Sequence, residues 1–451
     1  MSRLGPEKRN IHSVILNKVP AIGGSASGGK SSCLRIAAIA SLTIRIAINS
    51  RVFSIACASI MAVLIGLPFI IKGDGTPESI FYIFINYSLG LLIAVLSLLA
   101  AWCGAAAVSL EIDNRQMQLL SVKPLRAVEI WTGKLLGLMI MNVILLFFTG
   151  VLLYAMLQWS LASAKTTGQD LRREIMTVYR PVLPKSSEGA YKPVAIDPGQ
   201  IHQWSFDLPY AKAAALIKYR FIPSPFAHQS PMPLDWRAST EKNASLLFSN
   251  TIASSPHMVI SFRLAKTAAD CVLKLDCRNM QTNPAVTVFF PSEHDLQAQI
   301  PEGNFETNLA RALIMILARL CFFASLGMLA GTLFSFPVAS FVSLGLLAVS
   351  FSGGFVRQLA ETGMWFVSPN ENLSRPLVFL NDMVRTLFRS IATILPPLDR
   401  FDPLAFLPNG TLIPMELVGQ ALLVLCVLYS LILVLAGAFC LSRREIGLPT
   451  P

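Results

Sequence analysis

A charged segment separates two long apolar runs in this chain: Glu111-Ile-Asp-Asn-Arg-Gln-Met-Gln-Leu-Leu-Ser-Val-Lys-Pro-Leu-Arg-Ala-Val-Glu-Ile-Trp-Thr-Gly-Lys134. Its seven charged residues are Glu111, Asp113, Arg115, Lys123, Arg126, Glu129 and Lys134. The run before it, 79–110, and the run after it, 135–161, contain no charge. Charge-free runs of about 18 or more residues are typical of membrane-spanning helices. The segment is therefore predicted to face water between two spans, where it is well placed to contact a soluble partner.

The composition predicts a polytopic α-helical membrane protein. Of the 451 residues, 53% are hydrophobic and only 14% are charged, whereas a soluble domain has about 25% charged residues. The net charge is +11, and residues 1–52 contain eight Lys or Arg but only one acid. Such a basic segment favours the anionic cytoplasmic leaflet. Because no nucleic-acid-binding motif accompanies the charge, we expect membrane lipid as a partner and no nucleic acid.

Residues 1–51 are predicted to be a cytoplasmic basic tail that includes an amphipathic interfacial helix over 33–50. Ile39, Leu42 and Ile46 are spaced as one apolar face, although Arg35 falls on the same line and makes the pattern imperfect. The helix is expected to lie on the membrane surface before the first span. No apolar run follows the first residues, so a cleaved signal peptide is not expected.

One motif in this tail resembles a phosphate-binding loop. Gly24-Ser-Ala-Ser-Gly-Gly-Lys-Ser31 matches the pattern GxxxxGK[ST], which cradles phosphates between a buried strand and a helix. No soluble α/β domain follows, because the chain enters the predicted membrane region about twenty residues later. We therefore favour a flexible Gly/Ser tether over a nucleotide site.

Six transmembrane helices are predicted, and the chain is expected in the inner (plasma) membrane. Both termini are predicted to lie in the cytoplasm. The basic flank before the first span places the N-terminus inside. The predicted regions are spans 1–3 with the charged segment in 52–159, spans 4–5 in 309–356, and span 6 with a cytoplasmic tail in 416–451. Within the first region the spans cover 52–71, part of 79–110, and 135–158.

A β-rich extracytoplasmic domain is predicted between spans three and four, over residues 160–308. Short alternating runs recur about every 12 residues and favour a β-sandwich; they are 246–252, 257–264, 271–277 and 286–290. Four histidines also lie here (His202, His228, His257 and His294). Their spacing defines no metal site or catalytic triad, so we expect no metal, no catalytic residues and no enzyme activity on this chain.

Cysteines give little sign of a disulfide framework. Cys57, Cys103, Cys321, Cys426 and Cys440 lie in apolar runs, where cysteine acts as a small hydrophobe. Cys271 and Cys277 would lie on one side of a strand, roughly 20 Å apart. A disulfide between them requires a turn in between, because it needs Cα atoms within about 7 Å.

Two further features concern the second half of the chain. Arg319 lies inside the predicted fourth span, where an arginine either faces a partner or a water-filled path, or extends its charge to the interface. Both alternatives stay open. Residues 357–415 are predicted to be an extracytoplasmic loop with an interfacial or re-entrant helix, because Phe379, Met383, Val384, Leu387, Phe388 and Ile391 form an apolar stripe. Its five Lys or Arg run against the positive-inside rule.

The charged segment resembles the signature between the second and third spans of type-2 ABC exporter permeases. The matching residues are Glu111, Leu119-Leu120, Pro124, Arg126 and Gly133-Lys134, although the family often has Gly-Thr where this chain has Gln116-Met117. Three other regions are similar to the family: the basic helix before the first span, 395–402, and the Arg-Arg-Glu tail at 443–445. The resemblance covers roughly 300 residues and excludes 160–308.

This resemblance implies a permease subunit that pairs with a second permease, identical or related, and with two ABC ATP-binding subunits. The segment Glu111–Lys134 would supply the coupling helix, and ATP and Mg²⁺ would bind the ATPase, leaving no cofactor on this chain. Pro124 can fix a helix break, and Gly133-Lys134 allows a close approach as the third span begins. The alternative function is an ATPase-driven mechanical or signalling protein that acts through its extracytoplasmic domain without solute transport. The substrate of a permease does not follow from the sequence.

Overall fold

A computed structural model of the chain divides into two compact units. It describes residues 28–49, 51–70, 77–114, 126–163, 176–185, 192–208, 215–224, 230–240, 246–264, 271–282, 285–355, 357, 375–394 and 396–443. The helical unit comprises 1–165, 311–405 and 414–451, and the β unit comprises 166–310 and 406–413. Each unit is described separately below.

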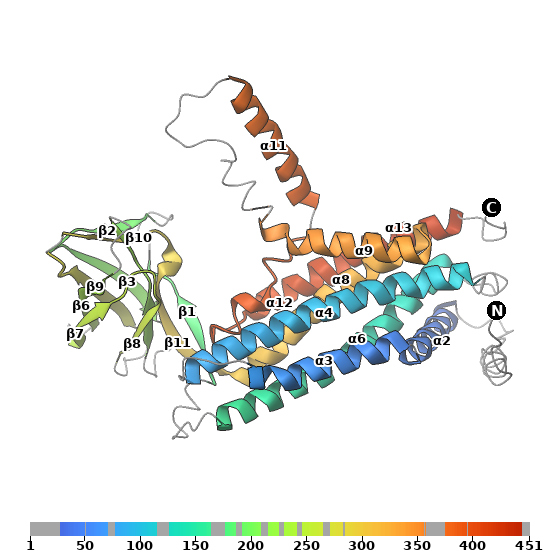
Figure 1. Ribbon diagram of the computed structural model, residues 1–451, viewed down its shortest axis with the longest axis horizontal. Coiled ribbons are helices and arrows are strands. Elements are labelled where there is room, and N and C mark those ends of the chain that lie inside the picture. The colour runs from blue at the N-terminus through green and yellow to red at the C-terminus, as the bar shows by residue number, and fades with distance from the viewer. Residues whose placement is uncertain are drawn as a thin grey trace. The chain divides into compact units, whose positions relative to one another are not determined.

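Long apolar helices form the helical unit (Figure 1). Their bounds are α2 Gly28–Ile48, α3 Arg51–Ile70, α4 Pro77–Asp113, α6 Ala127–Ser163, α8 Phe305–Leu333, α9 Phe336–Phe351, α11 Arg375–Ile394, α12 Met415–Ala421 and α13 Ser430–Arg443. A π-helix, η3 (Leu422–Tyr429), joins α12 to α13. The three form one continuous helical stretch, 415–443.

Four helical stretches among the described residues are long and apolar enough to cross a membrane: Phe81–Asp113, Ala127–Ala162, Phe305–Leu333 and Met415–Arg443. They correspond to the predicted second, third, fourth and sixth spans. A fifth would be the pair Ser32–Ile48 and Phe53–Leu67, which meet at 66°. The predicted fifth span corresponds to α9, whose 16 residues extend about 24 Å at 1.5 Å per residue. Six spans are thus not established.

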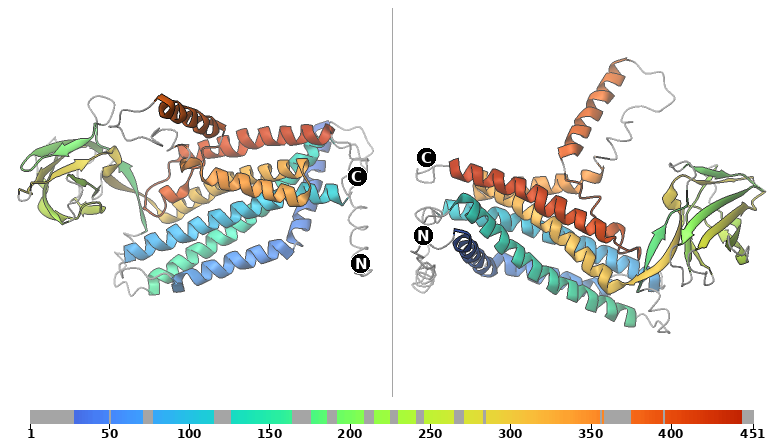
Figure 2. Two further views of the ribbon diagram at one scale, coloured as in Figure 1. Left: turned by 45° about the horizontal axis from the view of Figure 1, so that its top comes forward. Right: turned by 180° about the vertical axis from the view of Figure 1, so that it is seen from behind.

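Small residues let α4 and α8 approach closely within the bundle, where the helices run side by side (Figure 2). A methyl group added at Gly327 of α8 would overlap the carbonyl oxygen of Ala101 in α4. One added at Gly104 of α4 would overlap the carbonyl oxygen of Ala324. Close backbone approach through Gly and Ala is the usual basis of helix packing in lipid, where hydrophobic burial gives little drive for association.

The described residues of the β unit form three antiparallel sheets around one hydrophobic core. Their strand orders are β1-β11-β4-β8, β2-β10-β5 and β3-β9-β6-β7. The bounds are β1 Thr177–Val182, β2 Val194–Ile196, β3 Ile201–Leu208, β4 Leu216–Tyr219, β5 Ile222–Ser224, β6 Met232–Thr240, β7 Leu246–Ser254, β8 Ile260–Arg263, β9 Cys271–Asn279, β10 Thr287–Phe290 and β11 Leu296–Asn304. Side chains from all three sheets meet in the core, including Trp204, Trp236, Tyr219 and Phe290.

The β-rich character of this region agrees with the sequence prediction, but the detail differs. The four predicted runs correspond to β7, β8, β9 and β10. The described residues form three sheets where a sandwich has two, and seven of their strands lie outside the predicted runs. The sequence prediction did not include the strand β6. Its buried residues do alternate, at Met232, Leu234, Trp236 and Ala238. Pro233 and Asp235, however, interrupt the β-rich composition on the other face of the strand.

A segment distant in sequence completes the β unit. Residues 406–413 belong to it, although the prediction placed them in the loop 357–415. The backbone of Tyr179 donates to the carbonyl oxygen of Gly410 and accepts from Leu412, both at 2.8 Å. The side chain of Asn308 also donates to the carbonyl oxygen of Thr411 at 2.9 Å. Such backbone pairing has no composition signal, because it depends on which chain segment reaches the strand edge.

Cys271 begins the regular strand β9, and Cys277 is its seventh residue. No turn separates them, so the condition for a disulfide is not met. Cys277 is a free thiol that is fully buried, and burial raises its pKa well above the ordinary range.

Candidate functional site

Helices take up both ends of the charged segment. The prediction ended one apolar run at 110 and began the next at 135, but α4 continues to Asp113 and α6 begins at Ala127. Glu111 and Asp113 therefore lie in the last turn of α4, and Glu129, Gly133 and Lys134 lie in the first two turns of α6. The predicted coupling residues Arg115, Lys123 and Pro124 lie outside the described residues.

The start of α6 is set by Arg126 and Glu129. The carbonyl oxygen of Arg126 accepts hydrogen bonds from the backbone N–H groups of Glu129 and Ile130, at 2.9 and 3.2 Å. The carboxylate of Glu129 accepts in return from the backbone N–H of Arg126 at 3.2 Å. This is the reciprocal half of a capping box, and an acid in the first turn also suits the helix dipole. These interactions explain why the helix begins inside the charged segment.

A buried ion pair joins the end of α4 to the start of α6. Lys134 Nζ lies 2.5 Å from Glu111 Oε2 and also donates to the carbonyl oxygen of Ala107 in α4. The side chain of Lys134 is only 1% exposed. Removing ions from water costs several kcal/mol for each ion, so a buried pair persists only when each charge has a partner. The pair therefore couples the positions of the two helix ends.

The helix α2 packs on α6 beside this pair. Arg35 Nη2 lies 3.3 Å from Glu129 Oε1, and a methyl group added at Gly133 would lie 2.8 Å from Ile39 Cβ. The packing face is Ile39, Ala40 and Thr43, which are all buried.

This packing changes the predicted apolar face of α2. Ile46 is 48% exposed, so it is not part of the packing face. Arg35, which disturbed the predicted apolar stripe, is instead the residue that bonds α6 through Glu129.

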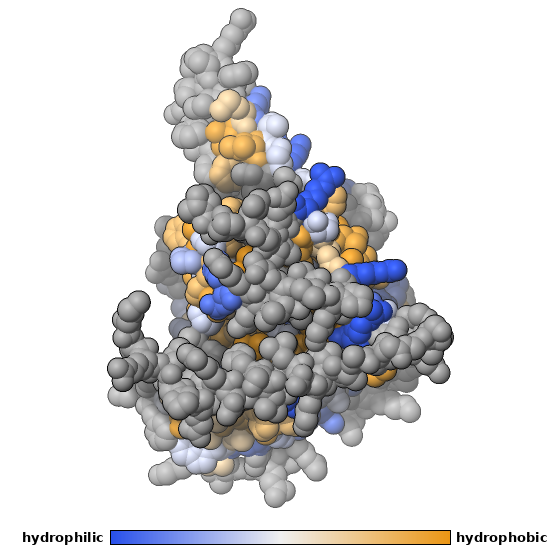
Figure 3. All heavy atoms as spheres, turned by 90° about the vertical axis from the view of Figure 1, so that its right-hand side faces the viewer, coloured by the Kyte–Doolittle hydropathy of each residue, from blue (hydrophilic) through white to orange (hydrophobic). Residues whose placement is uncertain are grey.

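A fourth helix joins the same region through α4. Asp113 Oδ2 accepts a hydrogen bond from the backbone N–H of Phe336, the first residue of α9, at 3.3 Å. A carboxylate is favourable at a helix N-terminus, where backbone N–H groups have no partner within the helix. Polar contacts thus tie α2, α4, α6 and α9 together at one end of the bundle. Hydrophilic groups stand beside hydrophobic ones on the end-on view of this side (Figure 3).

The site residues therefore fall into two groups. Glu111, Glu129 and Lys134 are engaged in ion pairs inside the bundle. Asp113 and Arg126 are exposed, so their side chains are the described charges of the segment that a soluble partner can reach. No protein-family model, no curated protein and no solved structure matches this chain.

Arg319 is buried and has a protein partner. Its side chain, 4% exposed, donates from Nη2 to the carbonyl oxygen of Leu398 at 2.8 Å. Its guanidinium also lies over the ring of Phe351, 5.7 Å from the centroid. The partner comes from the segment 395–402 that resembled the permease family.

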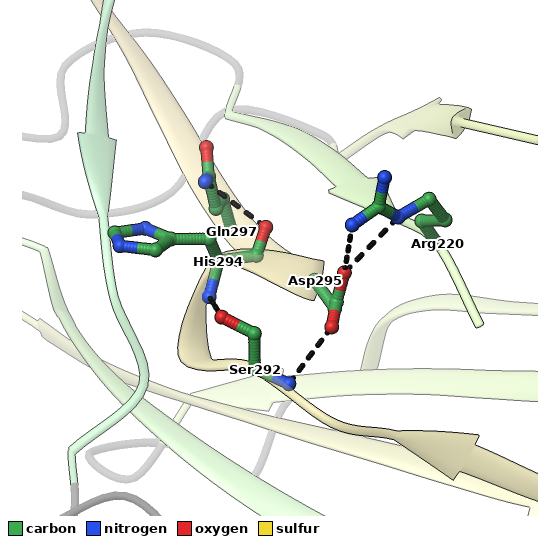
Figure 4. Close-up of polar contacts among 5 residues, drawn as sticks. All are labelled: Arg220, Ser292, His294, Asp295 and Gln297. Atoms are coloured by element: carbon green, nitrogen blue, oxygen red, sulfur yellow. Dashed lines mark hydrogen bonds and ion pairs between the residues drawn. The ribbon is translucent and has the colours of Figure 1, made fainter. Parts of the chain in front are cut away.

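A polar cluster in the β unit has a structural role (Figure 4). Asp295 Oδ1 accepts from Arg220 Nη2 at 2.8 Å, and Asp295 Oδ2 accepts from the backbone N–H of Ser292 at 2.8 Å. The carboxylate is 2% exposed, and these bonds hold the turn before β11 against the end of β4. His294 contributes its backbone to the cluster, donating to Ser292 and accepting from Gln297.

The other histidines are not gathered into a site in the described part of the β unit. His202 is half-buried with its ring 4.6 Å from that of Trp204, and burial lowers its pKa. His257 lies in a tight turn with a φ of 63°, and His228 falls outside the described residues. Within the described residues, no group of three or more His, Cys, Asp or Glu side chains could hold a metal ion.

The phosphate-loop motif at 24–31 overlaps a helix. The helix α2 begins at Gly28, so the flexible-tether prediction is wrong for residues 28–31, which form its first turn. Residues 24–27 lie outside the described residues.

Proposed function

We propose that this chain is the membrane-spanning permease subunit of an ABC transporter, coupling ATP hydrolysis on a separate subunit to export. The single observation that carries the proposal is the polar network at Glu111, Asp113, Glu129 and Lys134. It supports a mechanism in which displacement of residues 115–125 by an ATPase moves α4 and α6 together, and α2 and α9 with them. If the ends of α4 and α6 were not bonded to each other, the displacement would move only the connecting residues and not the spans.

The topology in this proposal has six spans with both termini in the cytoplasm. The first span is α3 and the fifth is α9, while α2 lies on the membrane surface before the 66° bend. The β unit is then an extracytoplasmic domain between the third and fourth spans. Exposed apolar side chains on α6 and α13, such as Phe147 and Phe439, are suited to contact lipid or the second permease subunit.

The positions of Glu111 and Lys134 decide which residues a test of the coupling segment should replace. Deleting 111–134 would remove the ion pair and unfold the helix ends, so loss of a partner would be uninformative. Replacing 115–125 by a Gly/Ser segment of equal length leaves Glu111 and Lys134 in place. The chain, tagged and purified from its native membrane, should then lose its co-purifying ATP-binding subunit while it still inserts.

A point variant and a control complete this experiment. Arg126→Glu reverses an exposed charge and should weaken retention of the ATPase. Lys185→Glu reverses an exposed charge in the β unit and should leave retention unchanged. Equal retention by wild type, R126E and the Gly/Ser chain would contradict the proposal.

A second function is favoured by the surroundings of Arg319. A permease that moves a polar solute needs a water-filled path, and Arg319 is bound to a backbone carbonyl instead. This contact favours an ATPase-driven mechanical or signalling protein that acts through the β unit without solute transport.

Thiol labelling distinguishes the two functions. The R319C thiol should react with a membrane-impermeant maleimide in one nucleotide state if a polar path opens there. In a mechanical protein it should stay unreactive in every nucleotide state, as should the lipid-facing control Ile314→Cys.

A further inference from the structure

Two cysteines predicted as separate small hydrophobes touch each other in the helical unit. Cys426 Sγ lies 3.3 Å from Cys321 Sγ, across 105 residues of sequence. Both thiols are free. Cys321 comes from α8 and Cys426 from the π-helix η3, so the contact joins two elements that are candidates to span the membrane.

The π-helix determines the position of Cys426. A π-helical turn contains more residues than an α-helical turn, so its presence rotates the following side chains relative to a continuous α-helix. Ser430 supports this register, because its hydroxyl donates to the carbonyl oxygen of Leu425, five residues earlier, at 3.0 Å. The same hydroxyl lies 3.4 Å from Cys321 Sγ. Isolated π-helical turns are rare and occur frequently at functional sites.

The two thiols differ in access. Cys321 is 3% exposed, whereas Cys426 is half-buried. Cys321 lies roughly 24 Å along α8 from Phe305, and Cys426 lies roughly 16 Å along its helix from Met415. Both positions are near the middle of their candidate spans. A reagent dissolved in the hydrocarbon core therefore reaches Cys426 first, and a water-soluble reagent reaches neither.

We propose that Cys321 and Cys426 are a redox modification site that forms a reversible disulfide by exchange with a lipid-soluble disulfide. Cys426 attacks the external disulfide as its thiolate, which gives a mixed disulfide and releases one thiol. Cys321 then attacks the Cys426 sulfur, forms the Cys321–Cys426 bond and releases the second thiol. Two cysteine thiols are oxidised, one external disulfide is reduced to two thiols, and the two protons leave on the released thiols.

The geometry requires only a small movement. A disulfide has an S–S length of about 2.05 Å, so the sulfurs must approach by about 1.2 Å. The product would lock α8 to the last helix and hold the π-helical register, because a return to α-helical turns would rotate Cys426 away. Formation of this disulfide requires neither a soluble partner nor any transport activity.

Reaction of the full-length chain in lipid nanodiscs with dithiodipyridine, a membrane-permeant disulfide, tests the site. Free thiols are then alkylated, and peptides are analysed by mass spectrometry. We expect a Cys321–Cys426 linked peptide that dithiothreitol removes. In Cys321→Ser the second step is blocked, so Cys426 should keep the pyridyl adduct. Membrane-impermeant glutathione disulfide should give neither product.

The controls separate pairing from general reactivity. Cys440→Ser removes another thiol of the last helix and should leave the linked peptide unchanged. Cys426→Ser should leave Cys321 unmodified, since the more accessible thiol of the pair is gone. The proposal is overturned if wild-type Cys426 keeps the pyridyl adduct to the same extent as in C321S, because the two thiols would then not react together.

Discussion

The ammonium nitrogen of Lys134 lies 2.5 Å from a carboxylate oxygen of Glu111, and this contact fixes the start of α6 to the end of α4. The residues that connect α4 to α6 belong to the charged segment. A partner that moves that connection would act on two long helices at once.

Removing one member of this pair should destabilise the helical unit. Lys134→Met leaves the Glu111 carboxylate buried without its cation, and breaking a buried ion pair costs about 3–5 kcal/mol. The double variant E111Q/K134M should recover part of that loss, because no charge is left unpaired. Thermal unfolding in detergent, followed by circular dichroism, measures both effects.

An exposed ion pair gives the matched control for that experiment. Lys185 and Asp207 lie 2.5 Å apart with more than half of each side chain exposed. Lys185→Met should lower stability by about 1 kcal/mol or less. A loss for K134M no larger than that for K185M would show that the Glu111–Lys134 pair does not hold the helix ends.

Adding a methyl group should be harmful at a glycine packed between α4 and α8 and harmless at a glycine of α9 that has open space beside it. Gly327→Ala places a carbon against the carbonyl oxygen of Ala101, and overpacking of this kind costs about 1–3 kcal/mol. Gly345→Ala in α9 meets nothing within 4 Å and should leave the melting temperature unchanged or slightly higher. Equal melting temperatures for the two variants would argue against close packing at Gly327.

The attachment of α2 should depend on Arg35. Arg35→Ala removes the ion pair with Glu129, which lies 3.3 Å away. Because Arg35 is about one-third exposed, we expect a loss of about 1 kcal/mol or less in global stability. Hydrogen exchange should nevertheless become faster in α2 and in the first turn of α6. The exposed Arg45 on the same helix is the control, and R45A should leave exchange in α6 unchanged.

The β unit should lose stability in mild acid through His202. Burial lowers the pKa of this ring below its ordinary value of 6.5, so the folded chain binds fewer protons than the unfolded chain as the pH falls. The stabilisation is therefore complete above about pH 6.5 and is lost as the pH falls through the folded-state pKa. Hydrogen exchange of β3, corrected for intrinsic rates, should rise over this range in wild type and much less in His202→Gln. The exposed His294 supplies the control, so H294Q should behave as wild type.

The sequence predicted the helices better than their ends. Hydropathy located the runs that became α4, α6 and α8, because charge-free length is a local property. It ended α4 too early and began α6 too late, because Glu111, Glu129 and Lys134 are paired inside the bundle and charge alone indicated water. Arg35 gave the one local signal of this pairing, since it interrupted an apolar stripe.

Features that depend on distant residues were not predictable in this way. The partner of Arg319 is a backbone carbonyl 79 residues away, and the strand edge at Tyr179 is completed by residues 410–412. The contact between Cys321 and Cys426 requires both helix packing and a π-helical register. Neither property has a signature in single-sequence hydropathy. Hydropathy alone therefore predicts that cysteines in apolar runs are isolated hydrophobes.

The central claim is that residues 115–125 transmit ATP hydrolysis to the helices through the bonded ends of α4 and α6. Its most direct test is the rate of ATP hydrolysis by the complex purified through a tag on this chain from its native membrane. Wild type should bring down a hydrolysing partner, and the chain with Gly/Ser at 115–125 should retain little or none of that activity at equal insertion and equal melting temperature. Hydrolysis at the wild-type rate in the Gly/Ser chain, or its absence from the wild-type preparation, would contradict the account.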